Sequence, residues 1–210
     1  MSNEKYFGLS ETELTTLQKL DTPRKVQDFL DTIPFNFSIH TLMSPRRVLA
    51  ARKAHCMEGA LLAALAFWMH GEAPLLLDLR TEAPDVDHVV ALFKRHGRWG
   101  AVSKTNHAVL RYREPVYQTV RELAMSYFHE YFLDNGKKTL RKFSEPFDLR
   151  RHAKHDWAVD KKNLWYLETA LDRSPHHVIA SSQTLRELRP ADKIEIKAGK
   201  ITEWKRKNRE

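Results

Sequence analysis

The only cysteine of this sequence, Cys56, stands where a helix is expected to begin. Unpaired amide groups and the positive end of the dipole at a helix N-terminus stabilise a thiolate, the nucleophilic form of cysteine. A thiolate nucleophile also needs an imidazole that exchanges a proton with it and that a third group holds in one orientation. His88, which follows a polar loop and begins an apolar run, is the candidate imidazole. Together these residues predict a thiol nucleophile with a histidine as general base and acid.

The sequence offers several candidates for the third residue, the one that orients the histidine. Ser103 falls in the second strand of a hairpin that starts at His88, about where a cross-strand neighbour of the ring would lie. Its hydroxyl can orient an imidazole, but a neutral group does not stabilise an imidazolium as a carboxylate does. Asp85 and Asp87 are further candidates, although both precede the histidine in the chain.

The segment after Cys56 predicts a central helix. From Met57 to Met69 almost every residue is apolar and Glu58 is the one charge, so the helix must be buried on nearly all sides. Gly71 ends this helix and Pro74 prevents its continuation.

Strands follow the helix. The run Leu75 to Leu79 is typical of a buried strand. The runs His88 to Phe93 and Arg98 to Ser103 flank a turn-sized, glycine-containing break at Lys94 to Gly97, which predicts an antiparallel hairpin. The predicted order is therefore helix, strand and hairpin, with the cysteine and the histidine each at the start of an element.

The flanking segments carry helix and turn signals. Residues 10–33 predict two short helices, the second capped by Thr22 with Pro23 in its first turn, and Ser44-Pro45 begins another. Further along we expect a long amphipathic helix from Pro115 to Asn135-Gly136, a helix from Asp160 to Leu171, and a closing hairpin of Lys193 to Lys197 and Lys200 to Trp204.

Four segments together resemble the transglutaminase-like superfamily. They are Cys56-Met57-Glu58-Gly59-Ala60, Gly71-Glu72-Ala73-Pro74, Asp87-His88-Val89-Val90 and Trp99-Gly100-Ala101-Val102-Ser103-Lys104-Thr105. In that superfamily a cysteine opens a buried helix, a Gly-x-Pro-type segment enters the next strand, a histidine begins a strand, and an aspartate follows a tryptophan on the next strand. The resemblance covers roughly residues 45–105, and Ser103 stands at the position that resembles the family's aspartate.

The resemblance implies an α+β, papain-like fold. A buried helix that carries the cysteine would pack on an antiparallel sheet. Residues 1–150 would form a helical N-terminal segment and the transglutaminase-like core, and residues 151–210 would form a C-terminal extension packed on that core, with a weakly marked boundary.

The chemistry implied by the resemblance is attack of the Cys56 thiolate on an amide or ester carbonyl. The resulting thioester would pass to water, as in a peptidase or amidase, or to an amine, as in an acyltransferase. His88 would be the general base and acid, and Ser103 or Asn106 would orient it, since a cysteine–histidine–asparagine arrangement is known from papain-like enzymes. This chemistry requires no metal or organic cofactor. Its substrate would be a peptide, a protein or a small amide or ester.

Two other functions fit parts of the sequence. The neutral Ser103 favours a scaffold or binding protein that kept the fold and lost efficient catalysis. The balance of 35 Lys and Arg against 27 Asp and Glu, a net charge of +8, with a basic stretch at residues 205–209, favours a nucleic-acid-binding module. Against this last interpretation, basic and acidic residues alternate along most of the chain and no nucleic-acid-binding motif is present.

The sequence predicts a cytoplasmic protein with no membrane span. Its longest run without charge, Gly59 to Met69, is shorter than the roughly 20 apolar residues that cross a bilayer. The first residues contain no apolar signal core, and a single cysteine makes no internal disulfide. The oligomeric state is left open.

Overall fold

The computed structural model describes residues 8–205, except for the side chains at positions 154 and 155. Within this range the sequence's apolar runs form one antiparallel sheet, whose strands lie in the order β4-β3-β2-β1-β5-β7, with β6 also paired to β1. The strands are β1 (Leu75–Thr81), β2 (His88–Arg95), β3 (Arg98–Val102), β4 (Arg113–Tyr117), β5 (Leu140–Ser144), β6 (Phe147–Asp148) and β7 (His176–Val178). The predicted α+β fold with an antiparallel sheet is confirmed.

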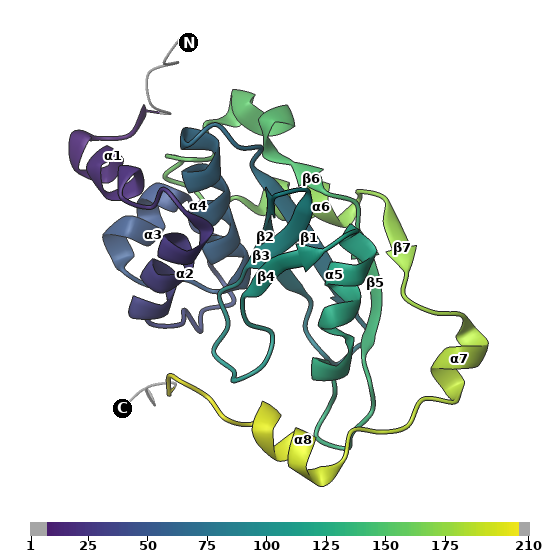
Figure 1. Ribbon diagram of the computed structural model, residues 1–210. Coiled ribbons are helices and arrows are strands. Elements are labelled where there is room, and N and C mark those ends of the chain that lie inside the picture. The colour runs from purple at the N-terminus through teal and green to yellow at the C-terminus, as the bar shows by residue number, and fades with distance from the viewer. Residues whose placement is uncertain (1–7, 206–210) are drawn as a thin grey trace.

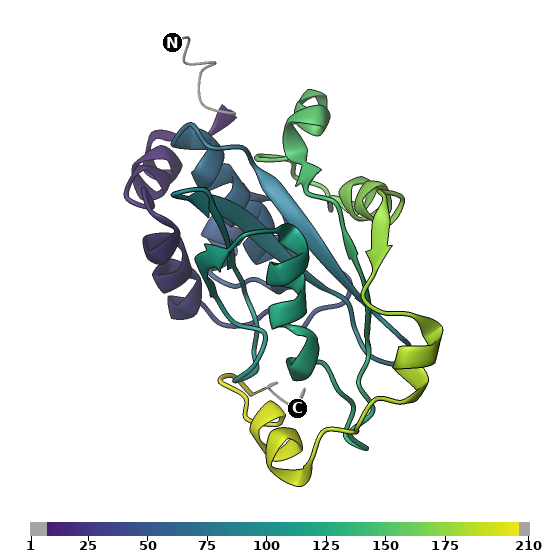
Figure 2. The same cartoon turned by 45° about the vertical axis from the view of Figure 1, so that its right-hand side comes forward.

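Helices cover both faces of the sheet. They are α1 (Glu11–Gln18), α2 (Pro23–Thr32), α3 (Pro45–Ala51), α4 (Cys56–Met69), α5 (Val120–Ser126), α6 (Trp165–Asp172), α7 (Ser182–Arg186) and α8 (Lys193–Gly199), with 3-10 segments at Phe128–Glu130 and Leu149–His155. Figures 1 and 2 show α1 to α4 gathered on one side of the sheet and α5 on the other. Among the described residues no helix has the length and apolar character needed to cross a membrane.

The central strand β2 separates two hydrophobic clusters. Val89, Ala91 and Phe93 belong to the cluster around α4, whereas Val90 and Leu92 belong to the cluster around α5. Successive side chains of a strand point to opposite faces, and a strand covered on both faces is apolar throughout. This explains why the run that follows His88 in the sequence shows no alternation with polar residues.

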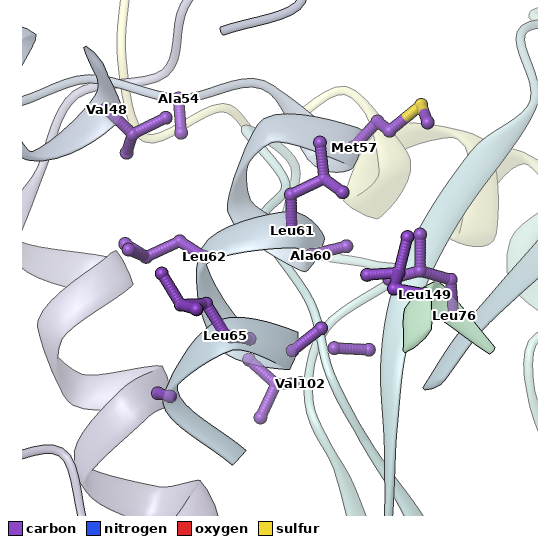
Figure 3. Close-up of a cluster of buried hydrophobic side chains, with 14 of the residues drawn as sticks. Val48, Ala54, Met57, Ala60, Leu61, Leu62, Leu65, Leu76, Val102 and Leu149 are labelled. Carbon is purple, nitrogen blue, oxygen red and sulfur yellow. The ribbon is translucent and has the colours of Figure 1, made fainter. Parts of the chain in front are cut away.

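Helix α4 lies in the middle of its cluster. Its residues from Met57 to Phe67 are all buried, and it packs on β2 and against α2 and α3. Figure 3 shows its leucines between Val48 on one side and Leu76 and Leu149 on the other. Each fully buried leucine of this kind contributes about 1.5–3 kcal/mol of transfer free energy. The helix is therefore held firmly, and its first residue, Cys56, has a fixed place.

The β2–β3 hairpin closes with a tight turn at His96 and Gly97. Both residues have positive φ angles, 48° and 77°, which is the geometry of the two-residue turn that matches the twist of paired strands. Residues 94 and 95, predicted to be part of the turn, are the end of β2. The hairpin pairs Ala91 with Val102, so the residues just past Val102 continue toward His88 at the start of β2.

The predicted starts of α2 and α3 are confirmed. Thr22 and Ser44 are the N-caps, and each is followed by a proline in the first helical position. At its other end α2 is held by Lys104, whose buried Nζ donates to the carbonyl oxygens of Leu30 and Ile33 at 2.8 and 2.6 Å. This contact ties α2 to the segment that follows β3.

The long helix predicted from Pro115 is wrong. Pro115 lies in β4, at the edge of the sheet, where a residue without an N–H group can be accommodated. The helix begins only after Thr119, whose hydroxyl accepts a hydrogen bond from the Glu122 N–H, and it ends at Ser126. A local cap therefore outweighed the proline as a start signal.

The predicted closing hairpin is also wrong. Residues 193–199 form α8, because the Asp192 side chain accepts from the Glu195 N–H and the Glu195 side chain accepts from the Asp192 N–H. This reciprocal capping box outweighs the alternation of apolar residues.

The helix expected from residue 160 begins instead at Trp165. Of the basic stretch at 205–209, residues 206–209 lie outside the described residues.

Residues after 150 share the core with residues before it. Trp157, Leu164 and Leu167 belong to the same buried cluster as α4. Strand β7 pairs with β5 and extends the sheet. The C-terminal segment thus packs directly on the helix that carries the cysteine.

Replacing Gly59 by alanine is expected to destabilise the protein. A methyl group at Gly59 would lie 2.5 Å from the Cβ of Lys104, which sits close to the backbone and cannot swing away. We expect the free energy of unfolding to fall by about 1–3 kcal/mol, whereas the same change in an unobstructed helix raises it by about 1 kcal/mol. Denaturant unfolding measures the sign, and a stabilised Gly59→Ala variant would contradict the close contact.

Candidate active site

Cys56 is the first residue of α4, a helix of 14 residues. The residue before it, His55, has an extended backbone, and its carbonyl oxygen accepts the first hydrogen bond of the helix from the Gly59 N–H at 2.9 Å. The Cys56 side chain is partly exposed and lines a cleft. The sulfur is therefore accessible at the positive end of a buried helix.

The structure brings His88 to Cys56. His88 begins β2, beside Leu79 of β1, and is only 6% exposed. Burial opposes ionisation of the Cys56 thiol, but hydrogen bonds to His55 and His88 and the positive charges of both rings lower its pKa well below its ordinary value. Cys56 thus interacts with two imidazoles, of which the sequence predicts only His88.

Ser103 fixes the tautomer of His88. The Ser103 Oγ lies 2.7 Å from His88 Nε2 and 2.5 Å from the carbonyl oxygen of Leu110. A carbonyl oxygen only accepts, so the single hydroxyl proton is donated to Leu110, and the oxygen must accept from an N–H at Nε2. The neutral His88 ring therefore carries its proton on Nε2, which leaves Nδ1 as the ring nitrogen that can take a proton from the thiol.

The backbone around Ser103 is held from two sides. Gln27 of α2 accepts from the Ser103 N–H at 3.0 Å and donates to the Ser103 carbonyl oxygen at 2.9 Å. The Leu110 N–H donates to the Glu130 carboxylate at 2.6 Å. These contacts keep both the serine hydroxyl and its carbonyl acceptor in position behind the imidazole.

The other candidate orienting groups are engaged elsewhere. The Asn106 side chain donates to the Trp204 carbonyl oxygen at 3.0 Å and accepts from the Trp204 N–H at 2.8 Å, so it holds the C-terminal segment. Asp87 accepts from the N–H and hydroxyl of Thr81 at 2.7 and 2.9 Å, and Asp85 accepts from the Thr139 hydroxyl. None of the three hydrogen-bonds to His88 within residues 8–205, and Ser103 is the group that does.

The sequence alone does not predict the role of Glu58. This carboxylate is completely buried and accepts hydrogen bonds from Asn36 Nδ2 at 2.9 Å, from the Met43 N–H at 2.9 Å and from the His55 N–H at 3.0 Å. One of its oxygens also lies 3.4 Å from His55 Nε2. The sequence signal for this role is the position of Glu58, since a glutamate in the third position of a helix commonly accepts a hydrogen bond from the N-cap amide.

His55 was missed as well, although it directly precedes the cysteine. Its Nε2 lies 3.0 Å from the Thr41 carbonyl oxygen. Burial lowers the pKa of His55, but its hydrogen bond to Cys56, the negative charges of Cys56 and Glu58 and the Thr41 carbonyl outweigh this and raise the pKa to about 9. The ring is therefore protonated at neutral pH.

The thiol opens onto a cleft of about 750 Å³. Phe35, Phe37 and Trp165 give it an aromatic wall. Its lining also holds carboxylates and cationic side chains; the carboxylates are those of Asp78, Asp85, Asp87, Glu168 and Asp172, and the cations are Arg80 and His55. The cleft is therefore acidic although the whole chain carries a net charge of +8.

Arg80 is surrounded by three of these carboxylates. Its guanidinium lies 3.3 Å from Asp78, 2.7 Å from Asp172 and 3.7 Å from Asp87. Glu168, on α6, has no hydrogen bond or ion pair within the part of the chain that the structure describes. In the same range no group of three or more His, Cys, Asp or Glu side chains is arranged to hold a metal ion.

Comparison with known proteins gives no assignment. No protein-family model matches the sequence, and no curated protein matches it.

Replacing Ser103 by alanine is expected to let the neutral His88 ring carry its proton on either nitrogen. The variant leaves the buried Nε2–H without its acceptor, which costs about 1–3 kcal/mol, and the ring can then place its proton on Nδ1. Nitrogen NMR of the ring at a pH where it is neutral should show the Nε2–H form in the unmodified protein and a mixture in Ser103→Ala.

Ser144→Ala is a matched control for this experiment. Ser144 is as buried as Ser103, and its hydroxyl accepts from the Asp78 N–H at 2.9 Å instead of from His88. Its loss should leave the His88 ring signals unchanged. A predominant Nδ1–H form in the unmodified protein would show that Ser103 does not accept from the ring.

Proposed function

We propose that this chain is a thiol-dependent hydrolase or acyltransferase that acts on an amide or ester bond through a thioester on Cys56. The observation that supports this most directly is the contact of an accessible helix N-terminal thiol with an imidazole whose other nitrogen is committed to Ser103. A lowered thiol pKa and a fixed general base are the two requirements of cysteine nucleophiles.

In the first half-reaction, His88 Nδ1 takes the proton of the Cys56 thiol. The thiolate sulfur attacks the carbonyl carbon and the electron pair of the C=O bond moves to oxygen. The oxyanion re-forms the carbonyl and expels the amine or alcohol, which takes the proton from His88 Nδ1. The Cys56 N–H, in the first turn of α4 and without an intrahelical acceptor, is a candidate donor to the oxyanion.

In the second half-reaction, water or an amine attacks the thioester carbon and gives a proton to His88 Nδ1. Collapse of the tetrahedral intermediate breaks the C–S bond and returns the sulfur as a thiolate, which recovers the proton. Each half-reaction therefore returns His88 to the Nε2–H form that Ser103 supports. An amine can replace water as the acyl acceptor if it reaches the thioester carbon.

We further propose that the fold is transglutaminase-like. The elements that carry the site occur in the order that the resemblance implies: α4 with the cysteine at its start, then β1, then the β2–β3 hairpin with the histidine at its start. Ser103 would occupy the place of the family's aspartate, just after β3. The segment after residue 150 would complete the cleft, because Trp165 and Glu168 of α6 line it.

The cleft favours a neutral or cationic group beside the scissile bond. Its carboxylates outnumber its cations, and Glu168 in particular makes no hydrogen bond or ion pair within the described residues. Like charges disfavour binding of an anionic group, and the aromatic wall suits an apolar or cationic side chain. A peptide or small amide without a carboxylate near the reacting carbonyl is therefore the proposed substrate class.

One observation favours a second candidate, a scaffold or binding protein with little catalysis. His88 has a neutral partner in Ser103, and the hydroxyl proton is already donated to Leu110. An imidazolium at His88 thus gains less stabilisation than one beside a carboxylate.

Alkylation of Cys56 by iodoacetamide across a range of pH separates the two candidates. A catalytic thiol should react as a thiolate that titrates well below the free value of about 8.5. His88→Ala should shift this midpoint upward, whereas His177→Ala, which removes an exposed imidazole from β7, should leave it unchanged. Slow labelling with an ordinary midpoint in the unmodified protein would favour the scaffold.

A further inference from the structure

We propose that His55, held by Glu58 and the Thr41 carbonyl, is a fixed cation that stabilises the Cys56 thiolate, while His88 alone transfers the proton. This inference rests on the proposed thiol chemistry and divides it between two histidines. His55 keeps its proton through the cycle, and no bond to it forms or breaks.

The backbone of His55 is fixed at the start of α4. Its N–H donates to Glu58 at 3.0 Å and its carbonyl oxygen accepts from the Gly59 N–H at 2.9 Å, so the residue is fixed on both sides as the N-cap of α4. Its side chain is 19% exposed and lies against Cys56 at the wall of the cleft. The imidazole therefore projects from a fixed backbone, and its contact with the Thr41 carbonyl oxygen orients it.

The Nε2 nitrogen of His55 has two acceptors nearby. Nε2 lies 3.0 Å from the Thr41 carbonyl oxygen, and the Glu58 carboxylate lies 3.4 Å from the same nitrogen. A carbonyl oxygen only accepts, so Nε2 carries a proton and Nδ1 remains for the hydrogen bond with Cys56. A ring with protons on both nitrogens donates to the carbonyl on one side and to a thiolate on the other.

The charges around His55 support its protonated form. Glu58 is buried and its other contacts are with neutral donors, so within the described residues its ion-pair partner is His55. Glu168 faces the site from α6, and its pKa is raised: burial and the charge of Asp172 are the main causes, the charge of Cys56 adds to them, and the charge of His55 opposes them. From β2 the facing titratable group is His88.

The two histidines differ in their partners. His88 hydrogen-bonds to a neutral hydroxyl, and no ion pair joins it to a carboxylate within residues 8–205. His55 has the carboxylate. The negative charge that the resemblance places beside the general base thus lies beside the other imidazole, where it stabilises a cation next to the sulfur.

This arrangement sets a pH window for the ion pair. The thiolate is present above the lowered pKa of Cys56, and the His55 cation is present below a pKa of about 9. A group whose pKa is raised in the folded state loses its favourable interaction as pH rises through that value. The thiolate–imidazolium pair therefore exists between these limits and is lost above about pH 9.

The test compares His55→Gln with His55→Lys. Glutamine keeps a donor for the Thr41 carbonyl but has no charge, so the midpoint for iodoacetamide alkylation of Cys56 should rise by at least about one pH unit, a tenfold loss of thiolate below the midpoint. Lysine restores a cation, so the alkylation midpoint of His55→Lys should lie close to that of the unmodified protein. A purely structural role would not be rescued by charge, and thermal unfolding of both variants shows whether each is folded.

A reciprocal measurement follows the pKa of His55 when Cys56 is replaced. Coupling between two groups is mutual, so Cys56→Ala should lower the pKa of His55 from about 9 in an NMR titration of the ring. Glu58→Gln is less informative, because the buried carboxylate accepts from three N–H groups and an amide would place a donor against them.

The outcomes are distinct. If the unmodified protein shows a lowered alkylation midpoint and His55→Gln leaves it unchanged, His88 alone stabilises the thiolate and the inference is overturned. If the unmodified protein itself shows an ordinary midpoint, the proposed function fails together with it. A lowered midpoint that rises in His55→Gln and returns in His55→Lys supports both.

Discussion

The buried carboxylate of Glu58 is the contact on which the rest of the site depends. A charge removed from water is costly unless it is hydrogen-bonded and paired, and here three N–H groups and a nearby imidazole supply those partners. Two of them, from Asn36 and Met43, belong to the loop between α2 and α3, and the third belongs to His55 at the start of α4. One side chain therefore fixes the loop that walls the cleft and the turn that presents Cys56.

A second chain of hydrogen bonds supports the site from the sheet. It runs from the Leu110 carbonyl through the Ser103 hydroxyl to His88, and Gln27 holds the serine backbone to α2. Because a hydroxyl has a single proton, the direction of the whole chain follows from its carbonyl end. The serine thereby orients the His88 ring, while the buried carboxylate of Glu58 lies beside the other imidazole, His55.

Elements that carry one strong local signal were predictable from the sequence. Where two local signals favoured different structures, the prediction followed the wrong one. The apolar run after Cys56, the capped starts of α2 and α3 and the hairpin at Gly97 were all predictable. Pro115 and the alternating pattern at 193–204 were misleading, because edge-strand position and a capping box decided those segments. His55 and Glu58 were visible as residues, but their roles depend on loop carbonyls and amides that no sequence pattern brings together.

Intact-protein mass spectrometry after mixing with an activated acyl ester tests the central claim most directly. If Cys56 is a catalytic nucleophile, the protein should gain one acyl group, the group should map to Cys56 by peptide analysis, and it should disappear with time as water or an added amine takes it. Cys56→Ala should gain none. Acylation that persists in Cys56→Ala, or a Cys56 that stays unmodified at neutral pH while exposed lysines react, would contradict the account.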